Sequence, residues 1–134
     1  MTESNRRSNI RLEVERAGRD LESARLLRAS GLLEGTMTHA YYAAFHHARA
    51  LLLMEGIEVR THRGVIHVLH RDFARTGRLP AEMVGWLSEL QAHRESADYD
   101  AAAVFNESMA DEALAKSRHF IAAAVEILTD EGWL

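Results

Sequence analysis

The chain has 134 residues, of which 47% are hydrophobic and 27% charged, a balance typical of one compact globular domain. It has no cysteine, which excludes a disulfide scaffold and a cysteine-ligated zinc site and fits a cytoplasmic location. The net charge is −4, yet residues 60–78 hold five arginines and one acid, so basic charge is concentrated there. The first 18 residues lack the apolar core of a secretory signal. The longest apolar run, ARALLLM, contains Arg49 and is too short to span a bilayer, so we expect no membrane association.

Hydrophobic spacing predicts five helices. In the first, apolar residues recur at alternating steps of four and three over residues 10–27, and Gly31 follows its end. We expect residues 1–9 to form a disordered or frayed N-terminus. The second helix covers about residues 36–55 and stops at Gly56. It is apolar on most sides, which is typical of a helix in the middle of a bundle or at an interface.

Capping signals place the other three helices. Thr61 is suited to cap the third helix, and Gly77 ends it. Pro80 marks the first turn of the fourth helix, and the fifth begins near Asn106. No segment alternates as a strand does. The sequence therefore predicts an all-α fold, an antiparallel bundle of four to five helices in a single domain over residues 1–134. Stripes of steps four and three are also typical of seams between helices, so a homodimer is plausible.

One arginine interrupts the apolar stripe of the fourth helix. Arg94 falls on the same face as Leu87 and Leu90. A guanidinium keeps its proton, so it needs an acidic partner, an anionic ligand or a water-filled cleft. One interpretation is an internal pair with Asp98, four residues on. The other is an arginine directed into a cleft or dimer groove, where it binds phosphate.

Basic residues also gather on the third helix. Arg63, His67, His70, Arg71 and Arg75 share one arc, opposite the apolar face. This arc is either an ordinary solvated face or a stripe that follows the phosphates of a nucleic acid, in which case binding would depend strongly on salt.

A polar and aromatic strip lies on the second helix, at His39, Tyr42, His46 and Arg49. These side chains are either satisfied core or interface groups, or the wall of a pocket that stacks a base and supplies an imidazole. His39 and His46 are about 10.5 Å apart along a helix, too far to share one metal ion. No carboxylate accompanies the histidines at a recognisable metal spacing, so we expect neither a metal site nor a cofactor.

Three segments together resemble the HEPN superfamily (higher eukaryotes and prokaryotes nucleotide-binding domain): AYYAAFHHARALLL, THRGVIHVLHRDFARTGRLP and RESADYD. The chain is most similar to the small prokaryotic stand-alone branch, whose members carry R-x-x-A-D-Y, over roughly residues 10–130. This resemblance implies a helical bundle that homodimerises. It also implies a metal-independent ribonuclease site, in which an R-x4–6-H motif from both subunits lines a shared groove. Many members are toxins that pair with a minimal nucleotidyltransferase antitoxin.

Carried over to this sequence, the resemblance makes Arg94 the motif arginine, but Tyr99 stands where the motif histidine could be. A phenol is a poor base at neutral pH, so catalysis would need His46, His62 or His93 as a substitute. Tyr99 could instead stack a base, bind a phosphate or accept a nucleotide. The predicted catalytic residues are Arg94, Tyr99 and His46. The predicted RNA- or nucleotide-binding residues are Tyr42, His62, Arg63, His67, Arg71 and Asp98.

Two functions follow from this resemblance. The first is a toxin-like protein of a toxin–antitoxin or defence system that binds and cleaves RNA at a homodimer groove. The second is a non-catalytic module that binds a nucleotide or docks a minimal nucleotidyltransferase through the same groove. A plain helical dimerisation protein is the third interpretation.

Overall fold

The computed structural model describes residues 1–134 and confirms the all-α bundle. Its elements are α1 (Glu3–Ala29), α2 (Leu33–Met54), α3 (His62–Leu69), the π-helical turn η1 (His70–Ala74), α4 (Ala81–Tyr99) and α5 (Glu107–Asp130). None of the helices combines the length and the hydropathy of a transmembrane segment.

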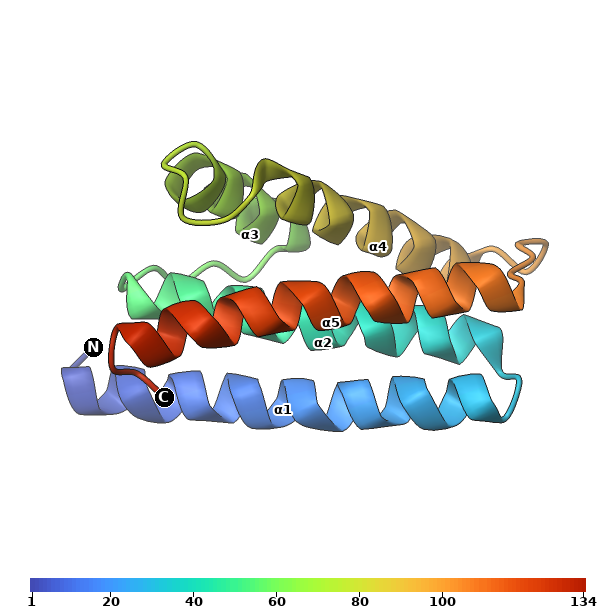
Figure 1. Ribbon diagram of the computed structural model, residues 1–134, viewed down its shortest axis with the longest axis horizontal. Coiled ribbons are helices and arrows are strands. Elements are labelled where there is room, and N and C mark those ends of the chain that lie inside the picture. The colour runs from blue at the N-terminus through green and yellow to red at the C-terminus, as the bar shows by residue number, and fades with distance from the viewer.

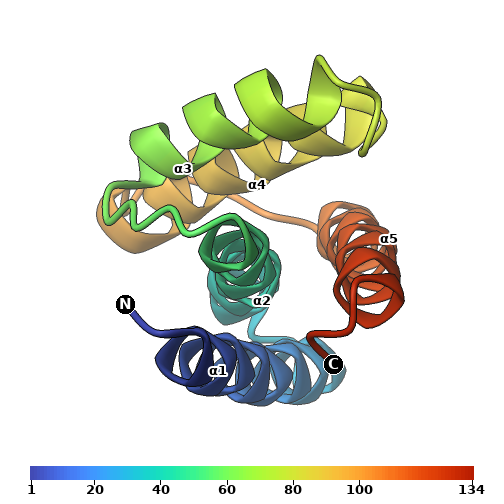
Figure 2. The ribbon, with the colours of Figure 1, turned by 90° about the vertical axis from the view of Figure 1, so that its left-hand side faces the viewer.

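The bundle is arranged around α2. In Figure 2, α1 lies below α2, α5 lies to one side, and α3 and α4 lie above it. Figure 1 shows that α1, α2 and α5 run side by side along the long axis, with both termini at the same end. No helix covers the side of α2 that faces away from α5. This arrangement leaves one side of the central helix, here called its open side, without a neighbouring helix.

The burial of α2 matches its position. Its fully buried residues include Tyr41, Leu51 and Leu52, which belong to the single hydrophobic core. Two polar residues of α2, Thr36 and His47, are buried as well, but a group of other positions on this helix is only partly buried. These partly buried positions include His39, Tyr42, His46 and Arg49, the polar and aromatic strip of the sequence. The open side of α2 therefore presents polar and aromatic groups rather than the aliphatic core.

The N-terminus differs from our expectation. Residues 1–9 were expected to be frayed, but α1 begins at Glu3, because the Thr2 hydroxyl accepts a hydrogen bond from the Asn5 N–H at 3.1 Å. The first turns of α1 also contact the C-terminal segment. The guanidinium carbon atoms of Arg6 and Arg7 lie 5.6 and 4.8 Å from the Trp133 ring centroid.

The predicted caps of α3 and α5 are confirmed. The Thr61 hydroxyl accepts from the Gly64 N–H at 3.0 Å, and the Asn106 side chain accepts from the Met109 N–H at 2.8 Å. After Leu69 the helix widens into η1, in which the Arg75 N–H donates to the His70 carbonyl at 2.9 Å. The sequence pattern did not predict this π-helical turn.

Candidate functional site

Arg94 is buried inside the chain, under the aromatic side chains of α2. α4 places it one turn after Leu90 on the inward face, and the residue is only 6% exposed. Its guanidinium carbon lies 5.5 Å from the Tyr41 ring centroid and 5.6 Å from the Tyr42 ring centroid. Both distances are within the range of a cation–π interaction, which stabilises the charge in the absence of water.

The hydrogen-bonding capacity of Arg94 is mostly unused. A guanidinium carries five N–H donors. The one partner of this guanidinium is Asp98, whose Oδ2 lies 3.5 Å from Nη1, at the long limit of a hydrogen bond. Asp98 makes a shorter bond elsewhere, because the Thr38 hydroxyl donates to its Oδ1 at 2.6 Å. The Nε atom of Arg94 is buried without any partner. The internal pair that the sequence suggested therefore exists, but it satisfies only a small part of the guanidinium.

A histidine from the start of α3 completes the surroundings of Arg94. The Tyr41 hydroxyl and His62 Nδ1 are 2.5 Å apart, a short hydrogen bond. The His62 ring also packs on Phe45, with 4.6 Å between ring centroids. Burial raises the pKa of Tyr41 well above its ordinary value, so this phenol stays neutral and keeps its proton. His62 and Arg94 thus share the same tyrosine.

The charge state of His62 follows from this environment. Burial lowers the pKa of His62, and the positive charge of Arg94 lowers it further. The imidazole is therefore mostly neutral at neutral pH, as a group that accepts a proton must be.

We call this group of side chains the Arg94 cluster. Its members are Thr38, Tyr41, Tyr42, Phe45, His62, Arg94 and Asp98. Four of these were predicted site residues. Thr38, Tyr41 and Phe45 were missed, although their spacing with Tyr42 could have indicated them. The four positions lie at i, i+3, i+4 and i+7, which is one face of a helix.

His46 borders this cluster but belongs to a second polar network, between α1 and α2. Its Nδ1 atom lies 2.6 Å from a Glu13 carboxylate oxygen, and its Nε2 atom lies 3.7 Å from an oxygen of Asp20. Asp20 is 3% exposed and also bonds His39 Nδ1 at 2.9 Å. No group of three or more acidic or histidine side chains in the chain has the arrangement of a metal site.

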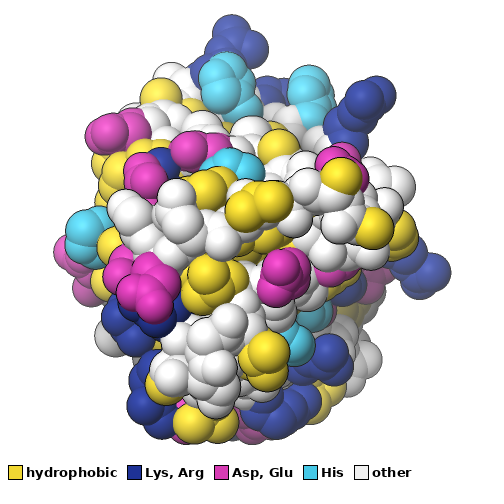
Figure 3. Space-filling view, turned by 90° about the vertical axis from the view of Figure 1, so that its right-hand side faces the viewer, with side chains coloured by type: hydrophobic (Ala, Val, Ile, Leu, Met, Phe, Trp, Pro, Cys, Tyr) yellow, Lys and Arg dark blue, Asp and Glu magenta, His cyan; other side chains and the backbone are white.

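The remaining predicted residues lie on the surface. Tyr99, the last residue of α4, is 81% exposed. Arg63, His67 and Arg71 are exposed on α3 and η1, and Arg71 forms a two-bond ion pair with its neighbour Asp72 at 2.8 and 3.1 Å. Figure 3 shows basic and histidine side chains projecting at the top of the molecule, the side where α3 lies. The structure therefore separates this basic stripe from the Arg94 cluster, with which it forms no hydrogen bond or ion pair.

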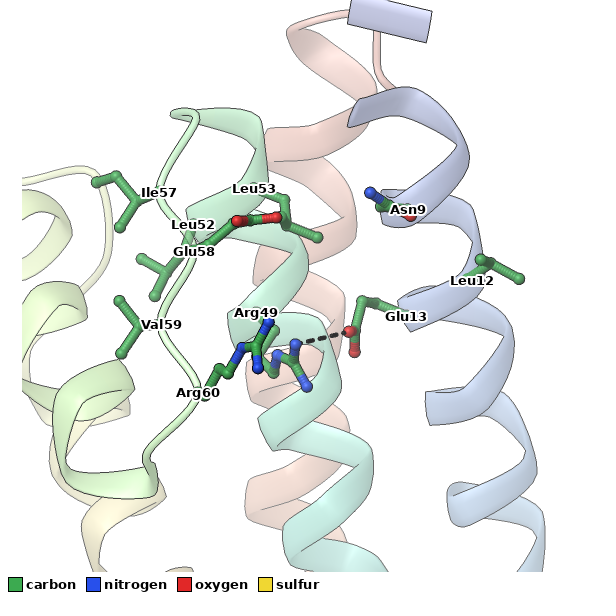
Figure 4. Close-up of a pocket in the computed structure, with 10 residues that line it drawn as sticks. All are labelled: Asn9, Leu12, Glu13, Arg49, Leu52, Leu53, Ile57, Glu58, Val59 and Arg60. Atoms are coloured by element: carbon green, nitrogen blue, oxygen red, sulfur yellow. Dashed lines mark ion pairs between the residues drawn. The ribbon is translucent and has the colours of Figure 1, made fainter. Parts of the chain in front are cut away.

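A cavity of about 230 Å³ opens next to the α2 strip, where α1, the end of α2 and the loop before α3 meet (Figure 4). Two arginines, Arg49 and Arg60, and two acids, Glu13 and Glu58, line it, above aliphatic side chains. Arg49 pairs with Glu13 at 3.5 Å. The two positive and two negative charges that line this cavity cancel, so it has no net charge that would attract an anion. Arg94 lines neither this cavity nor the three others in the chain.

Comparison with known proteins covers nearly the whole chain. A family model described as HEPN domain matches residues 10–128. A UPF0332 protein of Thermotoga maritima is 30% identical over 115 residues, which cover 86% of this chain and 87% of the relative. A UPF0332 protein of Gloeobacter violaceus is 32% identical over 116 residues, covering 86% and 92% of the two chains. A protein of Methanocaldococcus jannaschii named "Putative toxin MJ0142" is 30% identical over 108 residues, covering 81% and 74%.

Proposed function

The chain belongs to the HEPN domain family, and we propose that it is a toxin-like protein that binds and cleaves RNA without a metal ion, at a groove between two copies of the chain. Two relatives from Methanocaldococcus jannaschii carry the word toxin in their names, which supports a place in a toxin–antitoxin or defence system. In this proposal, Arg94 binds the phosphate at which the RNA is cut.

The observation that carries this proposal is the unused hydrogen-bonding capacity of Arg94. A buried charged group that is poorly paired is costly, so its retention calls for an explanation. A phosphate, like a carboxylate, can accept two parallel N–H bonds from a guanidinium. Binding would replace the 3.5 Å contact with Asp98 by shorter, charge-assisted bonds from the same nitrogen atoms. The site would then be more fully satisfied with RNA than without it.

The open side of α2 supports a second copy as the other wall of the site. No helix of the same chain covers this side, and its strip includes the partly buried ring of Tyr42. Aromatic rings on such a surface can stack on unpaired bases. A partner copy would cover this strip and enclose the RNA. Light scattering after size-exclusion chromatography tests this part, since a monomer at micromolar concentration would contradict a shared groove.

A cleavage assay tests the enzymatic part. Wild type, Arg94→Ala and Arg94→Lys are incubated with a mixed RNA pool in the presence of EDTA. We expect cleavage by wild type, none by Arg94→Ala and strongly reduced cleavage by Arg94→Lys, because an ammonium cannot form the two-bond contact. Arg118→Ala is the matched control, since Arg118 is exposed on α5 and has no ion pair. Equal cleavage by wild type and Arg94→Ala would refute the role of Arg94.

One observation favours the second candidate function, a non-catalytic module that docks a minimal nucleotidyltransferase. Tyr99 takes the place of the motif histidine, and its 81% exposure makes the phenol accessible to another protein. In that case wild type binds RNA or the partner without cutting RNA. Mass spectrometry of wild type and Tyr99→Phe, after incubation with the partner and ATP, would then find a nucleotide adduct on wild type alone.

A further inference from the structure

Because Tyr99 replaces the motif histidine, the proposed ribonuclease needs another imidazole as its acid–base group. The structure distinguishes the three candidates, His46, His62 and His93. Both ring nitrogens of His46 face carboxylates of α1, at 2.6 and 3.7 Å, so that imidazole is engaged in the α1–α2 network. His93 lies one residue before Arg94 and is therefore turned by about 100° around α4. Its ring packs near Phe105, at a centroid distance of 6.4 Å, and it lines a small hollow beside Lys116 of α5.

We infer that His62 is the acid–base residue of this site and that Tyr41 positions it. His62 packs against the same two tyrosines as Arg94: its ring centroid is 5.5 Å from that of Tyr41 and 6.0 Å from that of Tyr42. The imidazole and the guanidinium are thus brought together from two different helices. This inference rests on the proposed function, since it names a residue of that same site.

The hydrogen bond with Tyr41 leaves one ring nitrogen of His62 available. Nδ1 is bonded to the Tyr41 oxygen at 2.5 Å, whereas Nε2 has no hydrogen-bond partner in the chain. His62 is partly buried, and its unbonded Nε2 is not one of the fully buried polar atoms without a partner, so this nitrogen keeps some exposure to solvent. A hydroxyl can both donate and accept. When the Tyr41 oxygen accepts from Nδ1–H, Nε2 carries a free lone pair. The imidazolium that forms after proton uptake keeps the same bond, because it is a donor at both nitrogens.

The proposed step balances without any other reagent than water. The lone pair of Nε2 takes the proton of the RNA 2′-hydroxyl while O2′ forms a bond to phosphorus. The bond between phosphorus and O5′ breaks, its electron pair stays on O5′, and that oxygen takes a proton from water. The resulting hydroxide takes the proton of the imidazolium. Arg94 contacts the non-bridging phosphate oxygens and stabilises the charge that develops on them.

The charged groups around His62 set the expected pH dependence. Arg94 and Glu95 face it from α4, and His46 faces it from α2, together with the neutral Tyr41. The base must be neutral, so kcat/KM rises with pH through the pKa of His62. Burial and Arg94 lower that pKa, so the midpoint of the rise is expected below the ordinary value of about 6.5. Glu95 acts in the opposite direction, and Glu95→Gln is therefore expected to move the midpoint to lower pH.

The decisive experiment compares RNA cleavage and RNA binding by wild type, Arg94→Ala, His62→Ala and His119→Ala. His119 is an exposed histidine of α5 and serves as the control. We expect His62→Ala to lower kcat about 100- to 10,000-fold, the usual range for general acid–base catalysis, with RNA affinity nearly unchanged. Its melting temperature should fall, because the buried Tyr41 hydroxyl loses its partner, so activity is compared at a temperature at which the variant is folded. Added imidazole should restore part of its activity. For Tyr41→Phe we expect a fall of about tenfold in kcat at constant KM, the usual effect of losing one positioning hydrogen bond.

The outcomes separate this inference from the function on which it rests. If Arg94→Ala is inactive while His62→Ala retains activity within about threefold of wild type, His62 is not the acid–base residue and the proposed function stands. A second pair of results also overturns the inference. The His62→Ala protein is folded and inactive but imidazole does not restore its activity, and the pH profile of Glu95→Gln is the same as that of wild type. If wild type cuts no RNA, both fall together.

Discussion

Replacing Asp98 by asparagine distinguishes a phosphate-binding Arg94 from an internally paired one. Asparagine keeps an oxygen that can accept from the Thr38 hydroxyl, so the variant removes the negative charge and little else. The contact that is lost spans 3.5 Å between residues four apart, and the Asp98 side chain is 28% exposed. Exposed pairs four residues apart contribute about 0.3–0.5 kcal/mol, and the long contact keeps this pair near that range although the Arg94 side chain is only 7% exposed. We therefore expect Asp98→Asn to lower the free energy of unfolding by only about 0.5 kcal/mol.

The same substitution is expected to strengthen RNA binding. The Asp98 carboxylate lies beside the nitrogen atoms that would bind phosphate and repels any anion there. Two like charges about 4 Å apart repel by about 1 kcal/mol even in water. Because about 1.4 kcal/mol corresponds to a factor of ten, the affinity should rise about three- to tenfold. Urea unfolding followed by circular dichroism and RNA titration by fluorescence anisotropy measure the two effects. Glu126→Gln removes an exposed charge of α5 as the control.

The opposite result would refute this reasoning. If Asp98 neutralised Arg94 as a structural ion pair of the interior, removing its charge would cost about 3–5 kcal/mol. A loss of that size, together with unchanged or weaker RNA binding, would mean that Arg94 is a packing element whose natural partner is Asp98.

Three further predictions concern groups outside this pair. Asp20→Ala should lower the free energy of unfolding by about 1–3 kcal/mol in urea titrations, because it removes a buried carboxylate and leaves His39 Nδ1 without its partner; no loss would contradict a structural role of the α1–α2 polar network. Burial lowers the pKa of His47 and His62, so the unfolded chain binds protons first and stability should fall as pH drops below about 6.5; equal stability at pH 7 and pH 5 would contradict this. Tyr99→Phe should leave the melting temperature unchanged, since the ring is 81% exposed, but reduce activity; full activity would remove Tyr99 from the site.

The helices were predictable because their signals are local. The apolar spacing of each helix and the capping side chains of Thr61 and Asn106 lie within a few residues of the positions they control. The start of α1 was not predictable in the same way. Its first turns pack on Trp133, more than 120 residues away in the sequence, and no local pattern indicates that contact. The π-helical turn η1 was missed because it preserves the apolar stripe and changes only the backbone bonding.

The candidate site was predictable only in part, for a related reason. The inward position of Arg94 and its pairing with Asp98 follow from the helical spacing of α4 alone. The bond between Tyr41 and His62 depends on how α2 and α3 meet, whereas helical spacing alone indicates only that Tyr41 is a core residue. It is indeed fully buried, yet its hydroxyl is the part that matters for the site. The pairing of His46 with α1 likewise depends on tertiary packing.

The salt dependence of RNA binding tests most directly whether Arg94 binds phosphate. The logarithm of the binding constant is measured against the logarithm of the salt concentration for wild type, Arg94→Gln and the control Arg118→Gln. For single-stranded RNA, each lost phosphate contact should reduce the steepness of this line by about 0.7. We expect that reduction, with weaker binding, for Arg94→Gln alone. Parallel lines for wild type and Arg94→Gln would show that the guanidinium touches no phosphate and would contradict the proposed site.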